Sequence, residues 1–165
     1  MIPLVILGSA RADGETRRAV DIAFAGTAEL ITLSQHHIGG YDYSHGNDDD
    51  GFAAVVERML AHERLVFATP VYWYAMSAPL KIFFDRLTDL LETAKPSGRA
   101  LKGKQVWMIA TGVEADLPEG FEVPFRRTAD YFGMDYRGCG YLYTGEDKSL
   151  RTASEAALAA FGARI

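Results

Sequence analysis

The chain has 165 residues, of which 48% are hydrophobic and 24% are charged, and its formal net charge at pH 7 is −5. This length and balance predict one soluble globular domain spanning residues 1–165. An acidic chain without a basic stripe is a poor candidate for nucleic-acid binding. The single cysteine, Cys139, excludes an internal disulfide and any multi-cysteine metal site.

The same sequence features indicate the cellular compartment of the protein. No apolar run approaches the roughly 18 residues needed to span a bilayer, and the first residues lack the basic segment of a secretion signal. A lone thiol fits a reducing compartment. We therefore expect a cytoplasmic protein with no membrane partner.

Short apolar runs alternate with helix-period segments along the whole chain. The runs predict five strands, at Pro3–Gly8, Ala28–Leu33, Leu65–Ala68, Gln105–Ala110 and Tyr136–Tyr143. The periodic segments predict helices over Gly14–Phe24, Phe52–Leu60, Ser77–Leu91, Phe125–Phe132 and Leu150–Phe161, with Ser77 as the N-cap of the third. The polar segment Ser34–Asp50 and the stretch Lys95–Gly98 are expected to be non-helical. Strands that alternate with helices indicate an α/β fold, with a parallel sheet covered by helices on both faces.

The loop after the first expected strand, Gly8–Thr16, has the composition of an anion site. Ser9 and Thr16 supply hydroxyl donors, Arg11 supplies a charged fork, and the start of the next helix supplies free backbone amides. The alternative is a hydrophilic turn that only caps the helix. The loop lacks the glycine spacing of P-loop and dinucleotide folds, the cysteine of a phosphatase, and the acidic residues of a receiver domain.

The segment Thr69–Lys81 follows the third expected strand and holds three consecutive aromatic residues, at 72–74. In open α/β sheets, ligands bind at the carboxyl ends of strands. Because neighbouring side chains in a loop point in different directions, the three rings cannot all enter the core. At least one ring is expected to face a flat ligand such as an isoalloxazine, although a hydrophobic plug or a subunit interface would also use such rings.

Both loops resemble those of a known family. Gly8–Arg11 followed by Gly14–Thr16 resembles the phosphate loop of the flavodoxin-like NAD(P)H-dependent FMN reductases. Thr69–Tyr74, continuing into Leu80–Leu87, resembles the flavin-ring loop and following helix of that family. The two motifs have the family's order, and the strand pattern agrees across nearly the full chain.

The resemblance implies a flavodoxin-like three-layer sandwich, with strand order 2-1-3-4-5, that binds FMN non-covalently. It also implies NADPH or NADH as hydride donor, a small electron acceptor such as a flavin or quinone, and a homodimer or dimer-based oligomer whose interface often completes the flavin pocket. The cofactor carries the hydride chemistry, so no catalytic side chain is nominated. The implied cofactor-binding residues are Ser9, Arg11, Gly14 and Thr16 at the phosphate, Pro70, Val71, Tyr72, Trp73 and Tyr74 along the ring, and Thr111 and Gly112 in a third loop.

Two other functions remain open from the sequence. A flavodoxin-like electron carrier would use the same fold without NAD(P)H activity, and its acidic charge would suit a basic redox partner. A non-redox domain would keep the fold without the flavin. The loop at 113–123 has no motif that assigns it a substrate.

Other chemistry-bearing residues are interpreted as structural. His36, His37 and His45 lie with Asp48–Asp50 in a glycine-rich loop without metal-ligand spacing, so a solvated loop is expected there. As an alternative, Tyr41 and Tyr43 of that loop would lie beside the flavin of a partner subunit. Cys139 is expected to be a buried, inert thiol.

Overall fold

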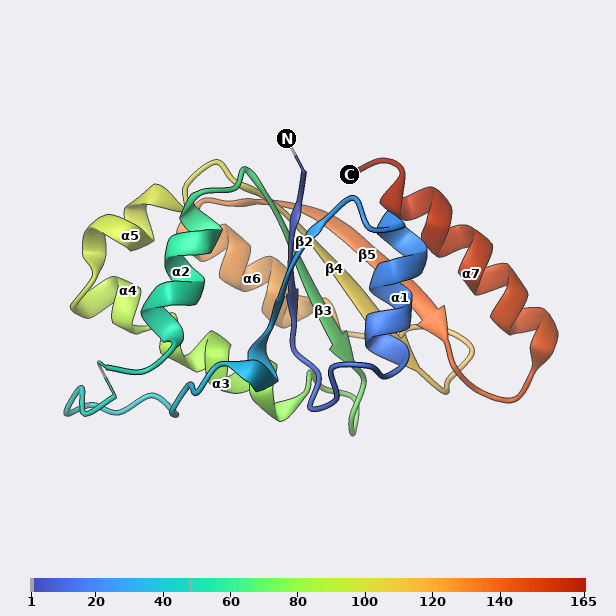
Figure 1. The fold of residues 1–165 in the computed structure, drawn as a ribbon, viewed down its shortest axis with the longest axis horizontal. Coiled ribbons are helices and arrows are strands. Elements are labelled where there is room, and N and C mark those ends of the chain that lie inside the picture. The colour runs from blue at the N-terminus through green and yellow to red at the C-terminus, as the bar shows by residue number, and fades with distance from the viewer. Residues whose placement is uncertain (1, 48) are drawn as a thin grey trace.

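A computed structural model describes residues 2–47 and 49–165, so Asp48 of the expected acidic run lies outside the described residues. Its centre is a five-stranded parallel sheet with the predicted order β2-β1-β3-β4-β5 (Figure 1). The strands are β1 (Leu4–Leu7), β2 (Glu29–Thr32), β3 (Arg64–Pro70), β4 (Gln105–Gly112) and β5 (Asp135–Tyr143).

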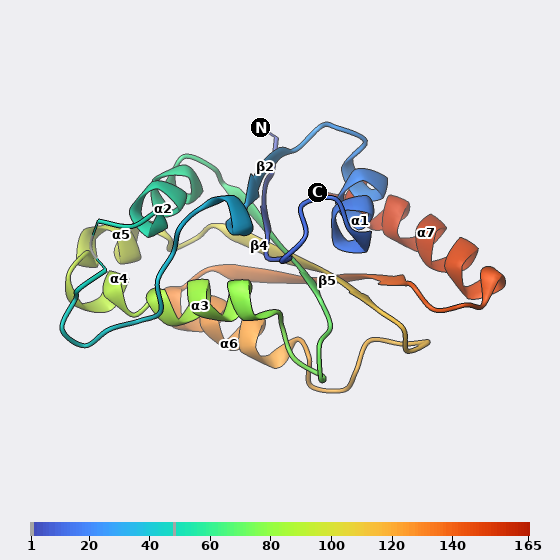
Figure 2. The same cartoon turned by 60° about the horizontal axis from the view of Figure 1, so that its bottom comes forward.

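Helices cover both faces of this sheet, as the alternating pattern predicts (Figure 2). The helices are α1 (Glu15–Phe24), α2 (Phe52–Leu60), α3 (Ala78–Arg86), α4 (Asp89–Glu92), α5 (Lys95–Ala100), α6 (Val123–Phe132) and α7 (Lys148–Gly162). Two apolar clusters result: α1 and α7 pack on one face of the sheet, while α2, α3 and α6 pack on the other. Gly133 ends α6 in the left-handed conformation, as expected of a helix-closing glycine.

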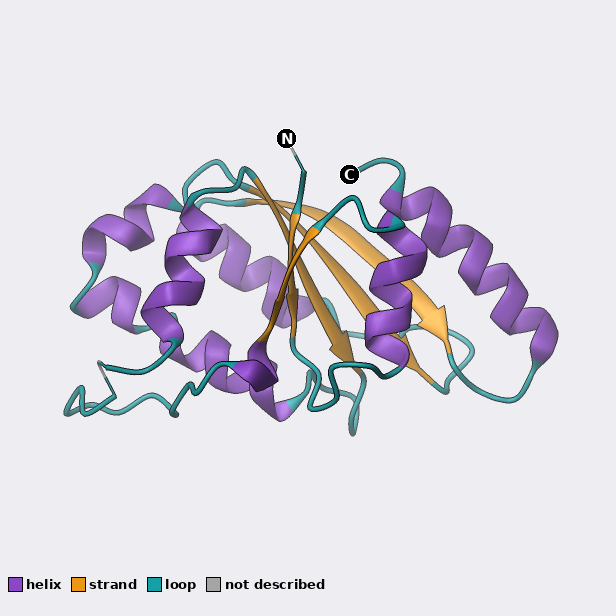
Figure 3. Ribbon diagram, viewed as in Figure 1, coloured by secondary structure: helices purple, strands orange, loops and turns teal. Residues whose placement is uncertain are grey.

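The loops that follow β1, β3 and β4 lie together at the carboxyl edge of the sheet, along the lower rim in Figure 3. This arrangement follows from the parallel pairing, because all carboxyl ends of the strands then face one way. These are the loops that the resemblance assigns to the phosphate and to the flavin ring, together with the third loop at Thr111 and Gly112. The fold therefore places all three parts of the predicted site at one edge.

The expected single helix over Ser77–Leu91 is wrong in its second half. Ser77 caps α3 as predicted, accepting the Leu80 N–H at 3.4 Å, but α3 ends at Arg86. The next two amides donate to the third preceding carbonyl instead of the fourth, which tightens the chain before α4 begins. The apolar stripe is real, although the regular helix is interrupted.

The expected break at Lys95–Gly98 is also wrong, because these residues begin α5. Pro96 lies in the first turn, where its missing N–H costs nothing. A Cβ on Gly98 would lie 2.4 Å from the Leu90 carbonyl oxygen, so glycine here permits close packing of α5 on α4. The Pro and Gly thus belong to a short helix rather than to a loop.

No helix among the described residues is both long and apolar enough to cross a membrane.

Candidate functional site

The loop between β1 and α1 leaves backbone amides available for an anion. Gly14 is extended at the N-cap, and no side chain caps the first turn of α1, which begins at Glu15. Ser9 is buried, and its hydroxyl oxygen accepts the Arg11 N–H at 3.2 Å. The start of α1 with these free amides has the geometry of a phosphate site.

Arg11 is the one cation of this loop, and its guanidinium is exposed. Its Nε lies 3.8 Å from an oxygen of Asp13, whose side chain is also exposed. An exposed ion pair at this distance contributes little free energy. Arg11 is therefore free to turn towards an anion held at the start of α1.

The three consecutive aromatics form a tight hairpin after β3. Tyr72 and Ala75 exchange two backbone hydrogen bonds of 3.0 Å, with Trp73 and Tyr74 at the tip. The exposed fractions of Tyr72, Trp73 and Tyr74 are 55%, 94% and 67%. The expectation that the three rings cannot all enter the core is confirmed, since all three are exposed.

The tip of this hairpin is strained. Trp73 has φ 49° and Tyr74 has φ 63°, so both adopt the left-handed conformation of a two-residue hairpin turn. Asn and Gly usually occupy such positions, because a side chain there costs about 1–2 kcal/mol per residue. A strained turn that also exposes large rings is typical of a functional element.

We expect Tyr74→Gly to be more stable than Tyr74→Ala. Both variants remove the ring, but only glycine relieves the strained backbone, so the Gly variant should be more stable by about 0.5–1 kcal/mol. Urea unfolding of the two variants measures this difference. Equal stabilities would show that the strain is no larger than the extra conformational entropy that glycine loses on folding.

Two buried hydroxyls fasten the hairpin to the β1 loop. Ser77 donates its hydroxyl to the carbonyl oxygen of Gly8, and its N–H donates to the Thr69 hydroxyl at 3.0 Å. A Cβ on Gly8 would lie 2.5 Å from Leu80 Cβ, so only glycine allows α3 to pack this close to the end of β1. Sequence reasoning identified Ser77 only as a helix cap and assigned no role to Thr69.

The third loop is tied to the other two. Thr16 and Thr111 are buried, and their hydroxyl oxygens lie 3.0 Å apart, which links the start of α1 to the end of β4. The Val71 N–H donates to the Thr111 carbonyl oxygen at 2.7 Å, which links the hairpin to the same strand. The predicted residues Thr16, Val71 and Thr111 are thus joined by direct contacts.

A groove of about 160 Å³ opens beside the hairpin. Four predicted residues line it together with four that the sequence did not single out, while Tyr72 is not among its lining residues. The lining residues are Val71, Trp73, Tyr74 and Gly112 with Val113, Glu114, Pro118 and Tyr141. The alternation of β5 could have pointed to Tyr141, since Ala110 and Tyr141 are paired in register.

Tyr141 closes the groove against Gly112. Its hydroxyl donates to the Glu114 carbonyl oxygen at 2.9 Å, and a Cβ on Gly112 would lie 2.7 Å from that hydroxyl. Burial, followed by the charges of Glu114 and Asp116, raises the pKa of Tyr141 to about 12. The phenol is therefore protonated at neutral pH and acts as a fixed donor.

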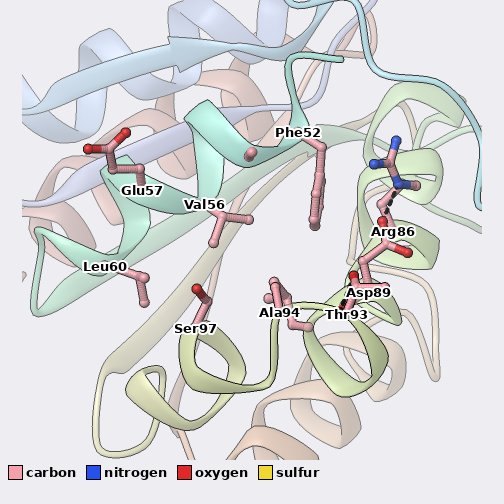
Figure 4. Close-up of a pocket in the computed structure, with 11 residues that line it drawn as sticks. Phe52, Val56, Glu57, Leu60, Arg86, Asp89, Thr93, Ala94 and Ser97 are labelled. Atoms are coloured by element: carbon pink, nitrogen blue, oxygen red, sulfur yellow. Dashed lines mark hydrogen bonds and ion pairs between the residues drawn. The ribbon is translucent and has the colours of Figure 1, made fainter. Parts of the chain in front are cut away.

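A larger cavity of about 360 Å³ lies away from these loops, between α2 and α4–α5 (Figure 4). Phe52, Val56 and Leu60 form one wall, with Ala94 and Ser97 opposite. Its polar side chains are largely committed within the protein, because Arg86 pairs with Asp89 and Thr93 donates to the Asp89 carbonyl. This cavity contains none of the predicted site residues.

Arg86 anchors the 36–50 loop beside that cavity, although the described residues of the loop are exposed or partly exposed, as expected of a solvated loop. The side chains of Arg86 and Asp50 are 4% and 8% exposed, and they form an ion pair. Arg86 also donates to Asp89 at 2.6 Å, to the Gly39 carbonyl at 3.2 Å and to the Asn47 carbonyl at 3.3 Å. The loop is polar in sequence, yet one buried guanidinium holds it in place.

The histidines, Cys139 and Tyr41 do not line the groove, and Cys139 is partly buried. Among the residues that the structure describes, no group of three or more His, Cys, Asp or Glu side chains is arranged to hold a metal ion. Burial raises the pKa of the Cys139 thiol well above its ordinary value, which keeps it protonated. Tyr41 donates to a Glu92 oxygen at 2.8 Å, so it is held against α4.

Comparison with known proteins agrees with this geometry. A model of the NADPH-dependent FMN reductase family matches residues 1–144. YwqN of Bacillus subtilis, whose name describes an NAD(P)H-dependent FMN-containing oxidoreductase, is 30% identical over 145 residues. That match covers 81% of this chain and 80% of YwqN.

Solved structures share the whole fold. The Trp repressor binding protein from Bacillus subtilis is 26% identical, with a TM-score of 0.72 over 95% of this chain and 94% of its own. General stress protein 14 from Treponema denticola, solved in complex with FMN, has a TM-score of 0.68 at 22% identity, covering 99% and 97% of the two chains. At that identity the second match speaks for the fold alone. From the family match and the shared architecture, the chain belongs to the NADPH-dependent FMN reductase family.

Proposed function

We propose that this protein binds FMN non-covalently across its β1, β3 and β4 loops and uses it to pass hydride from NADPH or NADH to a small acceptor, such as a flavin or quinone. One observation carries the proposal. The uncapped start of α1 and the exposed aromatic hairpin are tied together through Gly8, Ser77 and Thr69 at one sheet edge. A ligand with a phosphate at one end and a flat ring at the other fits that pairing, and general stress protein 14 is a relative by fold that holds FMN.

The phosphate end of the ligand would be held by Ser9, Arg11 and the first amides of α1. Arg11 supplies the charge, while the amides and the Ser9 hydroxyl supply directed donors. Thr16 is already bonded to Thr111, so its contribution is to fix the start of the helix. Gly14 lets the chain turn into α1 without a side chain over the amides.

The ring end would be met by the hairpin. Among the described residues, the N–H groups of Val71 and Tyr72 are taken by Thr111 and Ala75, and Pro70 has none. The amides of Trp73 and Tyr74 have no such partner in the described parts of the chain, and they are the donors left for the polar edge of the ring. Bound flavin would supply the hydride-accepting atom, and the reduced ring's negative charge favours donors of this kind.

The hydride donor and the acceptor would use the same exposed face of the ring in turn. Hydride transfer requires stacking and a fixed distance rather than an acid or base. The Tyr141 phenol is protonated and donates its hydrogen bond to the Glu114 carbonyl oxygen, so it supplies no base. Family membership supports this reductase over an electron carrier without NAD(P)H activity.

The lone thiol, Cys139, is consistent with a cytoplasmic setting.

The decisive experiment compares FMN binding and reduction in the wild type, Arg11→Ala and Arg99→Ala. We expect anaerobic NADPH or NADH to bleach wild-type, FMN-loaded protein near 450 nm. Arg11→Ala should bind FMN at least about tenfold more weakly, since a charge-assisted contact to phosphate is lost. Arg99 is an exposed arginine on α5 and serves as the matched control. Bound flavin that neither nucleotide bleaches would favour the electron carrier, and a protein that takes up no FMN would favour a non-redox domain.

We further propose that the protein is a homodimer, or an oligomer built from dimers. Trp73 and Tyr131 are large exposed rings, and Tyr131 and Leu91 border an apolar groove between α3–α4 and α6. Such rings are enriched at interfaces. Sedimentation equilibrium of the FMN-loaded protein at micromolar concentration should give twice the monomer mass or a multiple of it, and a monomer would contradict the proposal.

A further inference from the structure

The groove beside the hairpin is lined by a carboxylate and, among the described residues, by no cation. Glu114 lines it, and Asp116 on the same loop is close enough for its charge to raise the pKa of Tyr141. Glu119 is exposed a few residues further along. None of the eight lining residues is a lysine or arginine. Arg11 lies in the loop that would bind the phosphate, and its Nε lies 3.8 Å from an oxygen of Asp13.

These carboxylates are not neutralised elsewhere. In the chain outside residues 1 and 48, neither Glu114, Asp116 nor Glu119 forms an ion pair with a lysine, arginine or histidine. The groove walls next to them are apolar or aromatic, through Val71, Trp73 and Pro118. Walls of low dielectric constant strengthen the electric field in a cleft whose charges have one sign. A charged ligand that enters this groove is therefore subject to a negative potential.

On the basis of the proposed function, we propose that this groove selects its electron acceptors by charge. It favours uncharged and cationic acceptors over anionic acceptors of similar size, and Glu114 and Asp116 are the residues that determine this preference. Reduction of the flavin adds a further negative charge, so the repulsion is strongest at the step in which the acceptor enters. The class of substrate that fits is an uncharged quinone or a cationic aromatic oxidant.

The test uses two one-electron oxidants of opposite charge. FMN-loaded protein is reduced anaerobically with dithionite, which bypasses NAD(P)H, and is mixed with ferricyanide, of charge −3, or hexaammineruthenium(III), of charge +3. One two-electron-reduced anionic flavin reduces two oxidant molecules, releases one proton to solvent and returns to the oxidised form. Raising ionic strength should speed the reaction with ferricyanide and slow the reaction with hexaammineruthenium(III), since salt screens both interactions.

The variant Glu114→Gln/Asp116→Asn assigns the effect to the groove. At low ionic strength, its ratio of the ferricyanide to the hexaammineruthenium(III) rate constant should exceed that of the wild type by about tenfold. The control Glu57→Gln/Asp130→Asn removes the same charge from α2 and α6, and should keep the wild-type ratio. Equal shifts in the two double variants, or no salt dependence in the wild type, would overturn the proposal.

A binding measurement without turnover separates this inference from the proposed function. Quenching of tryptophan fluorescence, to which the exposed Trp73 contributes, reports binding of 1,4-naphthoquinone and of 1,4-naphthoquinone-2-sulfonate to flavin-free and FMN-loaded protein. The wild type should prefer the uncharged ring, and Glu114→Gln/Asp116→Asn should lose that preference. A preference that persists in a protein unable to bind FMN would overturn the proposed function alone. Equal affinity for the two quinones in both forms of the wild type would overturn the charge selection.

Discussion

Replacement of Gly8 by alanine is expected to destabilise the protein by about 2–3 kcal/mol, which corresponds to a fall in Tm of roughly 4–12 °C for a domain of this size. The added methyl would lie 2.5 Å from the Cβ of Leu80, a fully buried residue of α3. Neither backbone segment can move without cost. The Gly8 N–H donates to the Ala68 carbonyl at 2.8 Å, and its carbonyl accepts the Ser77 hydroxyl.

The same substitution should reach the flavin site, because Gly8 joins the two loops that would hold opposite ends of FMN. We expect FMN affinity to fall at least about tenfold, since a displacement of these loops misplaces either the phosphate or the ring. Thermal unfolding and a fluorescence titration with FMN measure the two effects. Gly40→Ala is the matched control, because a Cβ there meets no atom within 4 Å. An unchanged Tm in Gly8→Ala would show that α3 does not pack closely on β1.

The sheet and its order could be predicted from the sequence because apolar runs and helical periods report burial directly. The exposed hairpin rings could also be anticipated, since adjacent side chains in a tight turn diverge. The left-handed conformation of Trp73 and Tyr74 could not, because neither residue favours it. Tertiary packing holds this turn in place between β3 and α3. The backbone preferences of the two residues alone therefore do not predict its conformation.

The segment from residue 86 to 100 shows a second reason for failure. The i, i+3 and i, i+4 apolar spacing continues through a tightened turn, so periodicity alone cannot detect the end of α3 at Arg86. Gly98 reads as a helix breaker, yet its missing side chain allows α5 to pack on Leu90. The predicted set of site residues omitted Tyr141 for a similar reason, because this side chain reaches the groove from β5 through sheet register.

Arg86 was the most consequential residue to be missed, since a single arginine in an apolar stripe resembles a helix surface residue. Its guanidinium lies 4.7 Å from the centre of the Phe52 ring and binds Asp50, Asp89, Gly39 and Asn47. Two carboxylates therefore depend on one buried cation. Only the folded chain brings residues 36 positions apart into that contact.

Replacement of Arg86 by alanine should therefore destabilise the protein by about 3–5 kcal/mol, since it leaves the Asp50 and Asp89 carboxylates without their cation. Arg86→Lys should recover only part of the loss, because an ammonium lacks the planar fork that reaches four partners. Lys81→Ala is the control, because it breaks the exposed pair with Asp85, which contributes about 0.3–0.5 kcal/mol. Urea unfolding gives the free energies, and hydrogen exchange should show the 36–50 loop opening first in Arg86→Ala.

The pH dependence of this cluster has a defined sign. Burial raises the pKa of Asp50, but the N–H groups of Phe52 and Gly39 and the Arg86 guanidinium outweigh it, so the folded pKa lies below the usual 3.8. The stabilisation is therefore fully present above pH 3.8 and is lost as pH falls through the lower folded value. Unfolding free energies measured from pH 6 down to pH 2 should fall more steeply in the wild type than in Arg86→Ala. Parallel profiles would mean that Asp50 gains no stability from this cation, and that the loop is held by its backbone contacts alone.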